Sequence, residues 1–545
     1  MISAGTDSAC GLTAVLRRDE PPGLRELLLA GALLAAVAVA LYGVYPSRGA
    51  IVSDDWGFVG FYPTVGGGNA SLWELIDATN FPGYKPGNNL FSPLVWWAAG
   101  ENFAAYFWVG IALTALECSL FYAVLRLVGL RWAAAGTMAL LLVLLPSVDA
   151  TRLFYSAMHQ TLAASLYLGG VAAALVGLRA ASNRGRIALH GLAAVLYIAA
   201  IFTHEAFGVL IPFTAALYVV AAGRNEAWPR WFVDLGVTVV AGAVATNAAE
   251  VREGETSIGH VTDRFEPVVS SASEVFWALI PGDHLLGTLP TLLLLAALAA
   301  SVAVAVRRGG VLSEAARSWA VIAAFGLAFT VIGFASLLPA TDGFEPTYHG
   351  QLNRLTVPAS FGEVALIAAL LWLAAIAIAS LVRRPRLALA LAAVAVAGTA
   401  IAWARDERRG QDLWARADSE QERVLDAVDA GLAAQPRPVT GVVSFGHPQF
   451  VSTELGFVQV FQSDDLGRAL GVRRDLELDA RPYLPTSACD RDAFRFTAPD
   501  LGTARPSVFP YGELLFVDVR SGAAIRVASQ AQCKRAVARW GAAPS

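Results

Sequence analysis

Long apolar runs separated by short polar segments fill the chain from residue 24 to residue 403. About 20 apolar residues in a helix cross the hydrocarbon core of a bilayer. The pattern therefore predicts a polytopic α-helical membrane protein with about eleven spanning helices, of which 132–146 is short and 187–222 could instead form a re-entrant pair. The predicted spans are 25–45, 105–128, 132–146, 158–178, 187–203, 206–222, 232–249, 285–306, 318–338, 361–382 and 386–403.

The pattern changes after the last apolar run. Residues 405–433 have the spacing of an amphipathic helix. Three later segments, "TGVVSFG", "ELLFVDV" and "AAIRVAS", alternate as short strands do, and "DVRSGAAIRV" predicts a hairpin that turns at Ser521 and Gly522. We therefore expect two domains: a transmembrane domain over 1–403, and a small extracytoplasmic α/β domain over 404–545.

Arginines mark every second connection between the predicted spans, and cytoplasmic loops carry such an excess. This places the N-terminus in the cytoplasm, the first apolar run as a retained helix, and the C-terminal domain outside the inner (plasma) membrane. The loop over 46–104 is then the largest outer loop and carries interfacial helices. The arginine clusters are 126–131, 179–186, 224–230, 307–317 and 383–386.

Composition narrows the class of protein. The chain is 56% hydrophobic and only 15% charged, with a net charge of −4. These values exclude an ordinary soluble domain and give no sign of a nucleic-acid partner. Cys489 and Cys533 both fall in the predicted external domain, where the compartment permits a disulfide; two unpaired thiols are the alternative.

Two adjacent carboxylates, Asp54 and Asp55, follow the first predicted span in "IVSDDWGFVGFYPT". The aromatic residues around them, including Trp56, suit a sugar ring or an isoprenoid. Tyr84 and Lys85 follow in the same outer loop, and Lys85 is one of only two lysines in the chain. A carboxylate placed here could take a proton from a hydroxyl group. Alternatively, the acids lie in a solvated loop and cap a short helix.

Further ionisable residues lie near the predicted outer face. His204 and Glu205 end an apolar run, where such groups either contact substrate or form a buried pair between helices. His284, Tyr348, His349 and Arg354 precede later spans. No spacing among the histidines and carboxylates matches a metal motif, so we expect neither a metal nor another cofactor.

The order of these motifs resembles the GT-C superfamily of integral-membrane glycosyltransferases, including mannosyltransferases, arabinosyltransferases and TMTC-like members. The resemblance covers residues 25–403. Lysine stands at 85 where the family usually has arginine, and "HE" replaces the commoner "KE". The segments that carry the resemblance are the acidic pair, "YKPGNNLFSPL", "LLPSVDATRLFYSAMHQ", "FTHEAFGVLIP" and "YHGQLNRLTVPAS".

The resemblance implies transfer of a hexose or pentose from a polyprenyl-phosphate donor to an extracytoplasmic glycan, lipid or protein, with inversion. Asp54 is then the general base, Asp55 orients it or binds the acceptor, and Lys85 and Arg354 bind the donor phosphate. Membrane lipids are the other partners, and the pathway belongs to the cell envelope or cell wall. The substrate cavity is expected to include Trp56, Tyr84, His204, Glu205, His284, Tyr348 and His349.

Two other classes of protein remain as alternatives. A transporter or flippase commonly shows internal repeats and charges at mid-membrane. The chain shows no internal repeat, and the middle regions of the predicted spans are almost free of acids, with Glu117 and Glu363 as the exceptions. A polysaccharide ligase or polymerase would also work on the outer face with basic residues, but it would not need the acidic pair.

Overall fold

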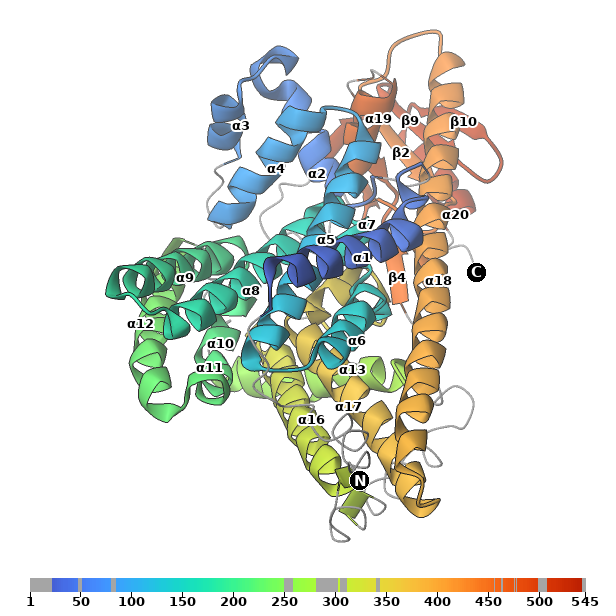
Figure 1. Ribbon diagram of the computed structural model, residues 1–545. Helices are drawn as coiled ribbons and strands as arrows, with labels where there is room; N and C mark the ends of the chain where they lie inside the picture. Colours follow the sequence, from blue (N-terminus) through green and yellow to red (C-terminus); the bar gives the residue numbers. More distant parts are fainter. Residues whose placement is uncertain are drawn as a thin grey trace, which may run out of the picture.

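A bundle of apolar helices carries a smaller α/β domain at one end in the computed structural model (Figure 1). In that figure, α2, α3, α4 and the C-terminal sheet lie at the upper end, while the turn between α17 and α18 lies at the lower end. The structure describes residues 22–47, 51–79, 85–248, 258–280, 302–303, 311–339, 344–454, 456–461, 464–474, 476, 478–497 and 507–541.

Seven helices in the described part of the chain are long and apolar enough to cross a membrane, as judged by length and composition. Helical geometry satisfies the backbone hydrogen bonds that hydrocarbon cannot, so the chain is a multi-pass membrane protein. These helices are α1 (Leu24–Tyr42), α5 (Phe103–Val128), α8 (Met158–Arg179), α9 (Asn183–Thr203), α16 (Val311–Ala335), α17 (Val357–Leu381) and α18 (Pro385–Ala433).

Four of the eleven predicted spans are not among these seven. The run at 132–146 forms the short helix α6 (Trp132–Val143), and 206–222 is broken into α10 (Ala206–Leu210), a 3-10 turn and α11 (Ala215–Ala222). The segment 232–249 falls in α12 (Arg224–Ala248), which is helical but not among the spans. Most of 285–306 lies outside the described residues. Helix α9 is a full-length span, so it does not pair with 206–222 as two short re-entrant helices.

Small residues let α16 and α17 pack closely. A Cβ on Gly362 would come within 2.3 Å of the Thr330 backbone nitrogen, and one on Gly333 within 2.4 Å of the Ala359 Cα. Close approach of backbones through small residues is the usual way in which membrane helices associate, because lipid offers no hydrophobic driving force between them. This contact fixes α17, and the segment that precedes α17 carries Arg354.

The predicted outer loop contains three helices: α2 (Asp55–Val59), α3 (Leu72–Ala78) and α4 (Pro86–Ala99). Ser71 and Glu74 form a capping box that starts α3. The helices expected in this loop are therefore present, and α3 and α4 both carry tryptophan. Between α6 and α8 lies α7 (Ala150–Leu153), and α13 (Ile258–Ala278) lies between α12 and α16.

The C-terminal domain is built on a four-stranded sheet in the order β10-β9-β2-β5. Strand β2 pairs in parallel with β5 and β9, while β9 and β10 form the predicted antiparallel hairpin, in which Gly522 has a φ of +68°. The three predicted strand segments are confirmed as β2, β9 and β10. The strands of this sheet are β2 (Gly441–Phe445), β5 (Asp479–Pro482), β9 (Leu514–Asp518) and β10 (Ala523–Val527).

Two smaller sheets and two helices complete this domain. One sheet has the order β6-β7-β8, and the other joins β1, which precedes α17, to β4 and β3. These elements are β1 (His349–Gly350), β3 (Phe450–Thr453), β4 (Gly456–Gln459), β6 (Ala488–Cys489), β7 (Ala493–Phe496), β8 (Ser507–Pro510), α19 (Asp465–Arg474) and α20 (Gln530–Trp540).

Helix α18 joins the two parts of the molecule. It runs without a break for 49 residues through the expected domain boundary near residue 403, so the last span and the predicted amphipathic helix are one element. On α19, Arg474 pairs with three α18 carboxylates, those of Glu422, Asp426 and Asp429. The α/β domain is therefore held along the C-terminal half of α18.

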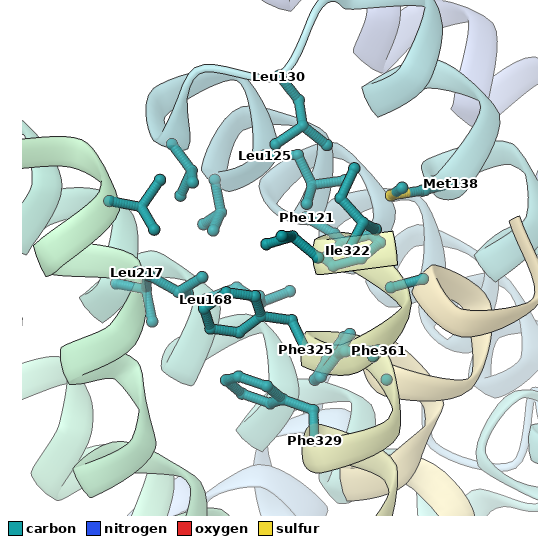
Figure 2. Close-up of a pocket in the computed structure, with 18 of the residues that line it drawn as sticks. Phe121, Leu125, Leu130, Met138, Leu168, Leu217, Ile322, Phe325, Phe329 and Phe361 are labelled. Carbon is teal, nitrogen blue, oxygen red and sulfur yellow. The ribbon is translucent and has the colours of Figure 1, made fainter. Parts of the chain in front are cut away.

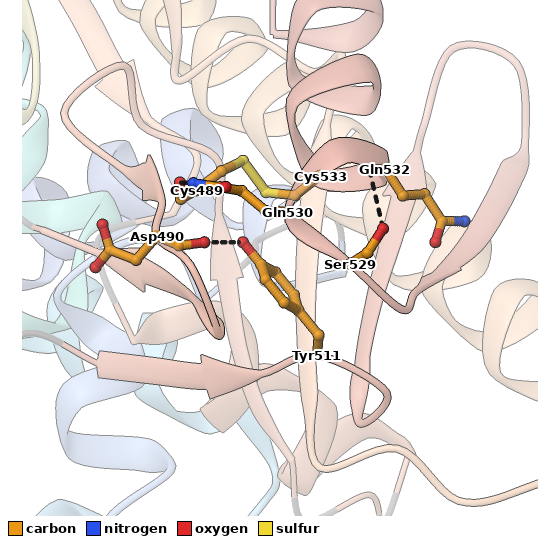
Figure 3. Close-up of a disulfide and its surroundings, with 7 residues drawn as sticks. All are labelled: Cys489, Asp490, Tyr511, Ser529, Gln530, Gln532 and Cys533. Carbon is orange, nitrogen blue, oxygen red and sulfur yellow. Dashed lines mark hydrogen bonds between the residues drawn. A yellow bond between two sulfur atoms is a disulfide. The ribbon is translucent and has the colours of Figure 1, made fainter.

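The expected disulfide between Cys489 and Cys533 is present and ties β6 to α20 (Figure 3). The two Cα atoms are 6.0 Å apart. Gln530 reinforces the same junction by donating to the Cys489 carbonyl at 2.9 Å. The bridge closes the C-terminal helix onto the small β6-β7-β8 sheet.

Candidate functional site

The Asp54 carboxylate lies beside the Arg354 guanidinium, with 3.6 Å between Oδ2 and Nη1. Asp54 immediately precedes α2, and its side chain makes no capping hydrogen bond to that helix. Capping of a short helix, the alternative explanation, is therefore not what this carboxylate does. The Asp54 side chain is 29% exposed and that of Arg354 16%, so the pair is reachable from outside the protein.

Asp55 differs from Asp54 in its burial and in its hydrogen bonds. It is fully buried, and its two oxygens accept the backbone N–H groups of Ser156 at 2.7 Å and Tyr155 at 3.3 Å. Burial raises the pKa of Asp55 to about 8, against the opposing effect of the Ser156 N–H. Asp55 anchors α2 to the turn before α8 and leaves Asp54 as the accessible acid.

Arg354 lies on a 3-10 helix, Gln351–Thr356, directly before α17. Its guanidinium carbon is 5.6 Å from the centre of the Phe154 ring, and Phe154 packs on Trp414 of α18 at 5.3 Å. A cation over an aromatic face is held in place by the ring quadrupole. The Arg354 guanidinium is thus held between the Phe154 ring and the Asp54 carboxylate.

Lys85 forms an ion pair with Glu205 at 3.0 Å, between the start of α4 and the end of α9. Gly87 makes this approach possible, since a Cβ there would lie 2.3 Å from the Thr203 hydroxyl. Partial desolvation acts to raise the pKa of Glu205, but the charge of the Lys85 ammonium, His204 and hydrogen bonds to the carboxylate together outweigh it, and the pKa falls to about 2. The Glu205 side chain remains 61% exposed, so this pair also faces open space.

His204 lies close enough to Lys85 and Arg354 for both charges to act on its imidazole. Burial lowers its pKa to about 3, and the positive charges of Lys85 and Arg354 act in the same direction while Glu205 opposes them. Both cations are therefore within electrostatic reach of one imidazole, which is neutral at pH 7. The ring also lies 5.7 Å from that of His159 at the start of α8.

Three residues expected in the substrate cavity are buried by contacts within the protein. Trp56 is fully buried, and its indole N–H donates to Gln421 of α18 at 2.7 Å. The Tyr348 hydroxyl donates to Asp406 at 3.5 Å, and the His349 Nδ1 lies 3.4 Å from an Asp149 carboxylate oxygen. Trp56 therefore does not offer its ring to a ligand, contrary to expectation.

Arg152 and Asp149 make contacts inside the protein. Arg152 donates to Tyr42 and to carbonyls at the end of α6, including that of Leu142 at 2.6 Å. Asp149 accepts from Asn353 at 2.5 Å. These contacts fix the turns around the site.

Tyr84 and His284 lie outside the described residues. Within the described ranges, no three His, Cys, Asp or Glu side chains come together as a metal site would require. Asp54 is in contact with Arg354, whereas Lys85 pairs with Glu205. Sequence reasoning missed the backbone donors of Tyr155 and Ser156, because main-chain groups leave no compositional signal.

An apolar cavity of about 140 Å³ lies in the helical part of the protein (Figure 2). Side chains from α5, α8, α16 and α17 line it, including Phe121, Tyr167, Ile322 and Phe361. Neither Asp54 nor either basic site residue lines this cavity. It is adjacent to the site through rings, since Phe207 lies 6.2 Å from His204 and 5.9 Å from Tyr167.

Comparison with known proteins gave structural similarity only. No protein-family model matches the chain, and no curated protein sequence matches it. Among solved structures, ArnT from Cupriavidus metallidurans overlaps in its apo state with a TM-score of 0.37 and 17% identity, over 75% of this chain and 81% of ArnT. ArnT bound to undecaprenyl phosphate overlaps with a TM-score of 0.38 and 14% identity, over 76% and 82%.

Overlaps with these identities and TM-scores transfer no activity and no residue role to this chain. The roles of the site residues therefore depend on contacts within the chain itself.

Proposed function

We propose that this chain is a GT-C-type membrane glycosyltransferase. It moves a hexosyl or pentosyl group from a polyprenyl-phosphate donor to an acceptor of the cell envelope on the outer face of the inner membrane. One observation carries the proposal. The Asp54 carboxylate is accessible, caps no helix and lies 3.6 Å from the guanidinium of Arg354, in a chain that carries few charges. The acceptor is a glycan, a lipid or a protein.

Asp54 acts as the general base in this proposal. Its carboxylate takes the proton of an acceptor hydroxyl as that oxygen attacks the anomeric carbon of the donor sugar. The bond between the anomeric carbon and the phosphate oxygen breaks, and its electron pair leaves with the polyprenyl phosphate. A single displacement without a covalent intermediate inverts the anomeric centre. No metal is needed for this step.

Lys85 and Arg354 stabilise the leaving phosphate. The donor phosphodiester carries one negative charge, and the phosphate monoester that leaves gains another. Cations fixed beside it therefore interact more strongly with the transition state than with the bound donor, as catalysis requires. Before substrate binds, Glu205 and Asp54 hold the two cations in place at 3.0 Å and 3.6 Å.

The apolar cavity gives the isoprenoid chain a place. Its lining is almost wholly hydrocarbon, and the rings of Phe207 and Tyr167 lead from it toward His204 and the cations. A lipid whose tail occupies this cavity would bring its phosphate to the polar site. The neutral imidazole of His204 could then donate a hydrogen bond to the donor without adding charge.

The test is release of polyprenyl phosphate by purified protein in nanodiscs from a panel of radiolabelled polyprenyl-phosphate hexoses and pentoses, with membrane glycans, lipids and proteins as acceptors. The proposal expects one donor to be consumed and Asp54→Asn to abolish its consumption. A protein that consumes none of them, but moves the intact lipid between leaflets of a proteoliposome, is a flippase. If the protein extends a lipid-linked polysaccharide, and Asp54→Asn extends it equally well, the protein is a ligase or polymerase.

A further inference from the structure

The C-terminal domain, together with the C-terminal half of α18, contacts the loop that carries Asp54. The side chain of Gln421, on α18, is fully buried there. It accepts the Trp56 indole N–H at 2.7 Å and donates to the Ile51 carbonyl at 3.0 Å. One amide group thus holds the loop on both sides of Asp54.

The backbone between these two contacts is strained. Ser53, directly before Asp54, has a φ of +47° and is fully buried. A residue with a side chain rarely adopts this left-handed conformation, and it persists only where surrounding contacts over-determine it. The two hydrogen bonds of Gln421, on Ile51 and Trp56, bracket the strained residue. They therefore help to maintain the turn that aims the Asp54 carboxylate.

The same domain also contacts the segment that carries Arg354. Strand β1 pairs in parallel with β4, His349 opposite Gly456 and Gly350 opposite Phe457. The backbones approach so closely that a Cβ on Gly350 would lie 2.0 Å from the Phe457 carbonyl oxygen. Gly350 has a φ of +83°, so glycine is required there for both reasons. Arg354 follows four residues later in the sequence.

Gln459, at the end of β4, touches both segments at once. Its side-chain oxygen accepts from the Ser53 hydroxyl at 3.4 Å, and its backbone N–H donates to the Gln351 side chain at 3.3 Å. Ser53 precedes Asp54, and Gln351 lies on the 3-10 helix of Arg354. Two further contacts fix the Asp54 loop from α19: Arg468 donates to the Gly57 carbonyl, and Arg473 lies over the Trp56 ring.

We infer that the C-terminal domain sets the geometry between Asp54 and Arg354, with Gln421 and Gln459 as its positioning residues. The inference rests on the proposed function for its catalytic consequence. The general base and the phosphate-binding arginine belong to segments far apart in the sequence. The domain that follows the last span joins them, so it is part of the catalytic machinery and not an appended binding module.

The test compares two glutamine substitutions on the same helix. Gln421→Leu removes both hydrogen bonds to the Asp54 loop, while Gln411→Leu removes a bond of the same kind, to the Leu41 carbonyl at 3.1 Å, away from that loop. Small misplacements of a reacting group cost up to about a hundredfold in rate. We expect kcat to fall about 10- to 100-fold in Gln421→Leu, with donor KM within about threefold of wild type, and Gln411→Leu to retain wild-type kcat.

Trp56→Phe provides the second variant, because it keeps an aromatic ring at this buried position and removes the indole N–H together with the five-membered ring that carries it. It should lower kcat in the same direction, and Gln421→Leu combined with Trp56→Phe should be no slower than Gln421→Leu alone, since the two changes remove the same bond. Equal kcat for Gln421→Leu and Gln411→Leu, or a loss that appears only in donor KM, would overturn the inference.

Hydrogen exchange on the same proteins separates this inference from the proposed function. Amides of residues 53–60 should exchange faster in Gln421→Leu than in Gln411→Leu or wild type. Unchanged exchange would overturn the positioning role whatever the activity. If the wild-type protein transfers no sugar but exchange in this segment rises as expected, the glycosyltransferase proposal fails, while the domain's hold on the Asp54 loop stands.

Discussion

Asp54 and Arg354 meet at 3.6 Å although one follows the first membrane helix and the other precedes α17. The contact pairs a candidate base with a candidate anion-binding group before any substrate is present. A preformed pair of this kind costs no reorganisation at the moment of reaction. It also lets the roles of neighbouring residues be separated by substitution.

Asp54→Asn should lower sugar transfer by roughly two to four orders of magnitude, because the amide keeps the shape of the side chain and cannot accept the proton. The thermal midpoint should stay at the wild-type value, since the carboxylate caps no helix. Transfer rate and polyprenyl-phosphate affinity are measured on the same preparation. Asp77→Asn, at an exposed acid on α3, is the control. If Asp54→Asn transfers sugar at nearly the wild-type rate, Asp54 is not the general base.

Asp55→Asn should act mainly on stability. The amide nitrogen would face a backbone N–H of Tyr155 or Ser156, so one buried hydrogen bond becomes a contact between two donors. Loss of such a bond costs about 1–3 kcal/mol in the free energy of unfolding. Denaturant or thermal unfolding in nanodiscs measures it. A variant as stable as wild type but inactive would instead mark Asp55 as a reacting group.

Lys85→Ala should weaken binding of polyprenyl phosphate about tenfold or more, the value of one charge-assisted hydrogen bond to phosphate. Stability should change little, because exposed ion pairs such as that with Glu205 contribute about 0–1 kcal/mol. The matched control is Lys534→Ala, at the chain's other lysine, which is exposed on α20. Equal affinities of the two variants for the lipid phosphate would exclude Lys85 from the donor site.

His204 should make the protein less stable in acid. Its folded-state pKa of about 3 lies below the ordinary 6.5, so only the unfolded chain takes up the proton between those values. Stability from this group is complete above about pH 6.5 and is lost as the pH falls toward 3. Between pH 7.5 and 5.5 the thermal midpoint should therefore fall further in wild type than in His204→Phe. An equal fall in both proteins would contradict a buried neutral imidazole.

The disulfide between Cys489 and Cys533 predicts a simple thiol count. The chain has four cysteines, so denatured, unreduced protein should react with two equivalents of a thiol reagent, and reduced protein with four. Cys533→Ser should destabilise the C-terminal domain by about 2–5 kcal/mol, the usual cost of removing a native disulfide from a small domain. Four reactive thiols before reduction would contradict the bridge.

The spacing of apolar residues was enough to identify seven helices as spans, because hydrocarbon admits a backbone only when its hydrogen bonds are satisfied internally. Alternation likewise located β2, β9 and β10. The pattern was less decisive at 206–222, where Pro212 lies in a 3-10 turn between two short helices. It also placed a domain boundary near residue 403, through which α18 runs unbroken.

The acidic pair itself shows where sequence reasoning stops. The sequence predicted that Asp54, Asp55 and Lys85 share the loop after the first span and that Arg354 precedes a late span, since the apolar runs mark where that loop and that span begin and end. It could not say which acid is accessible. Asp55 is buried because its carboxylate binds the backbone N–H groups of Tyr155 and Ser156. Asp54 stays accessible because the contacts of Gln421 and Gln459 orient the strained turn at Ser53. Such contacts join segments hundreds of residues apart, and only the packed chain creates them.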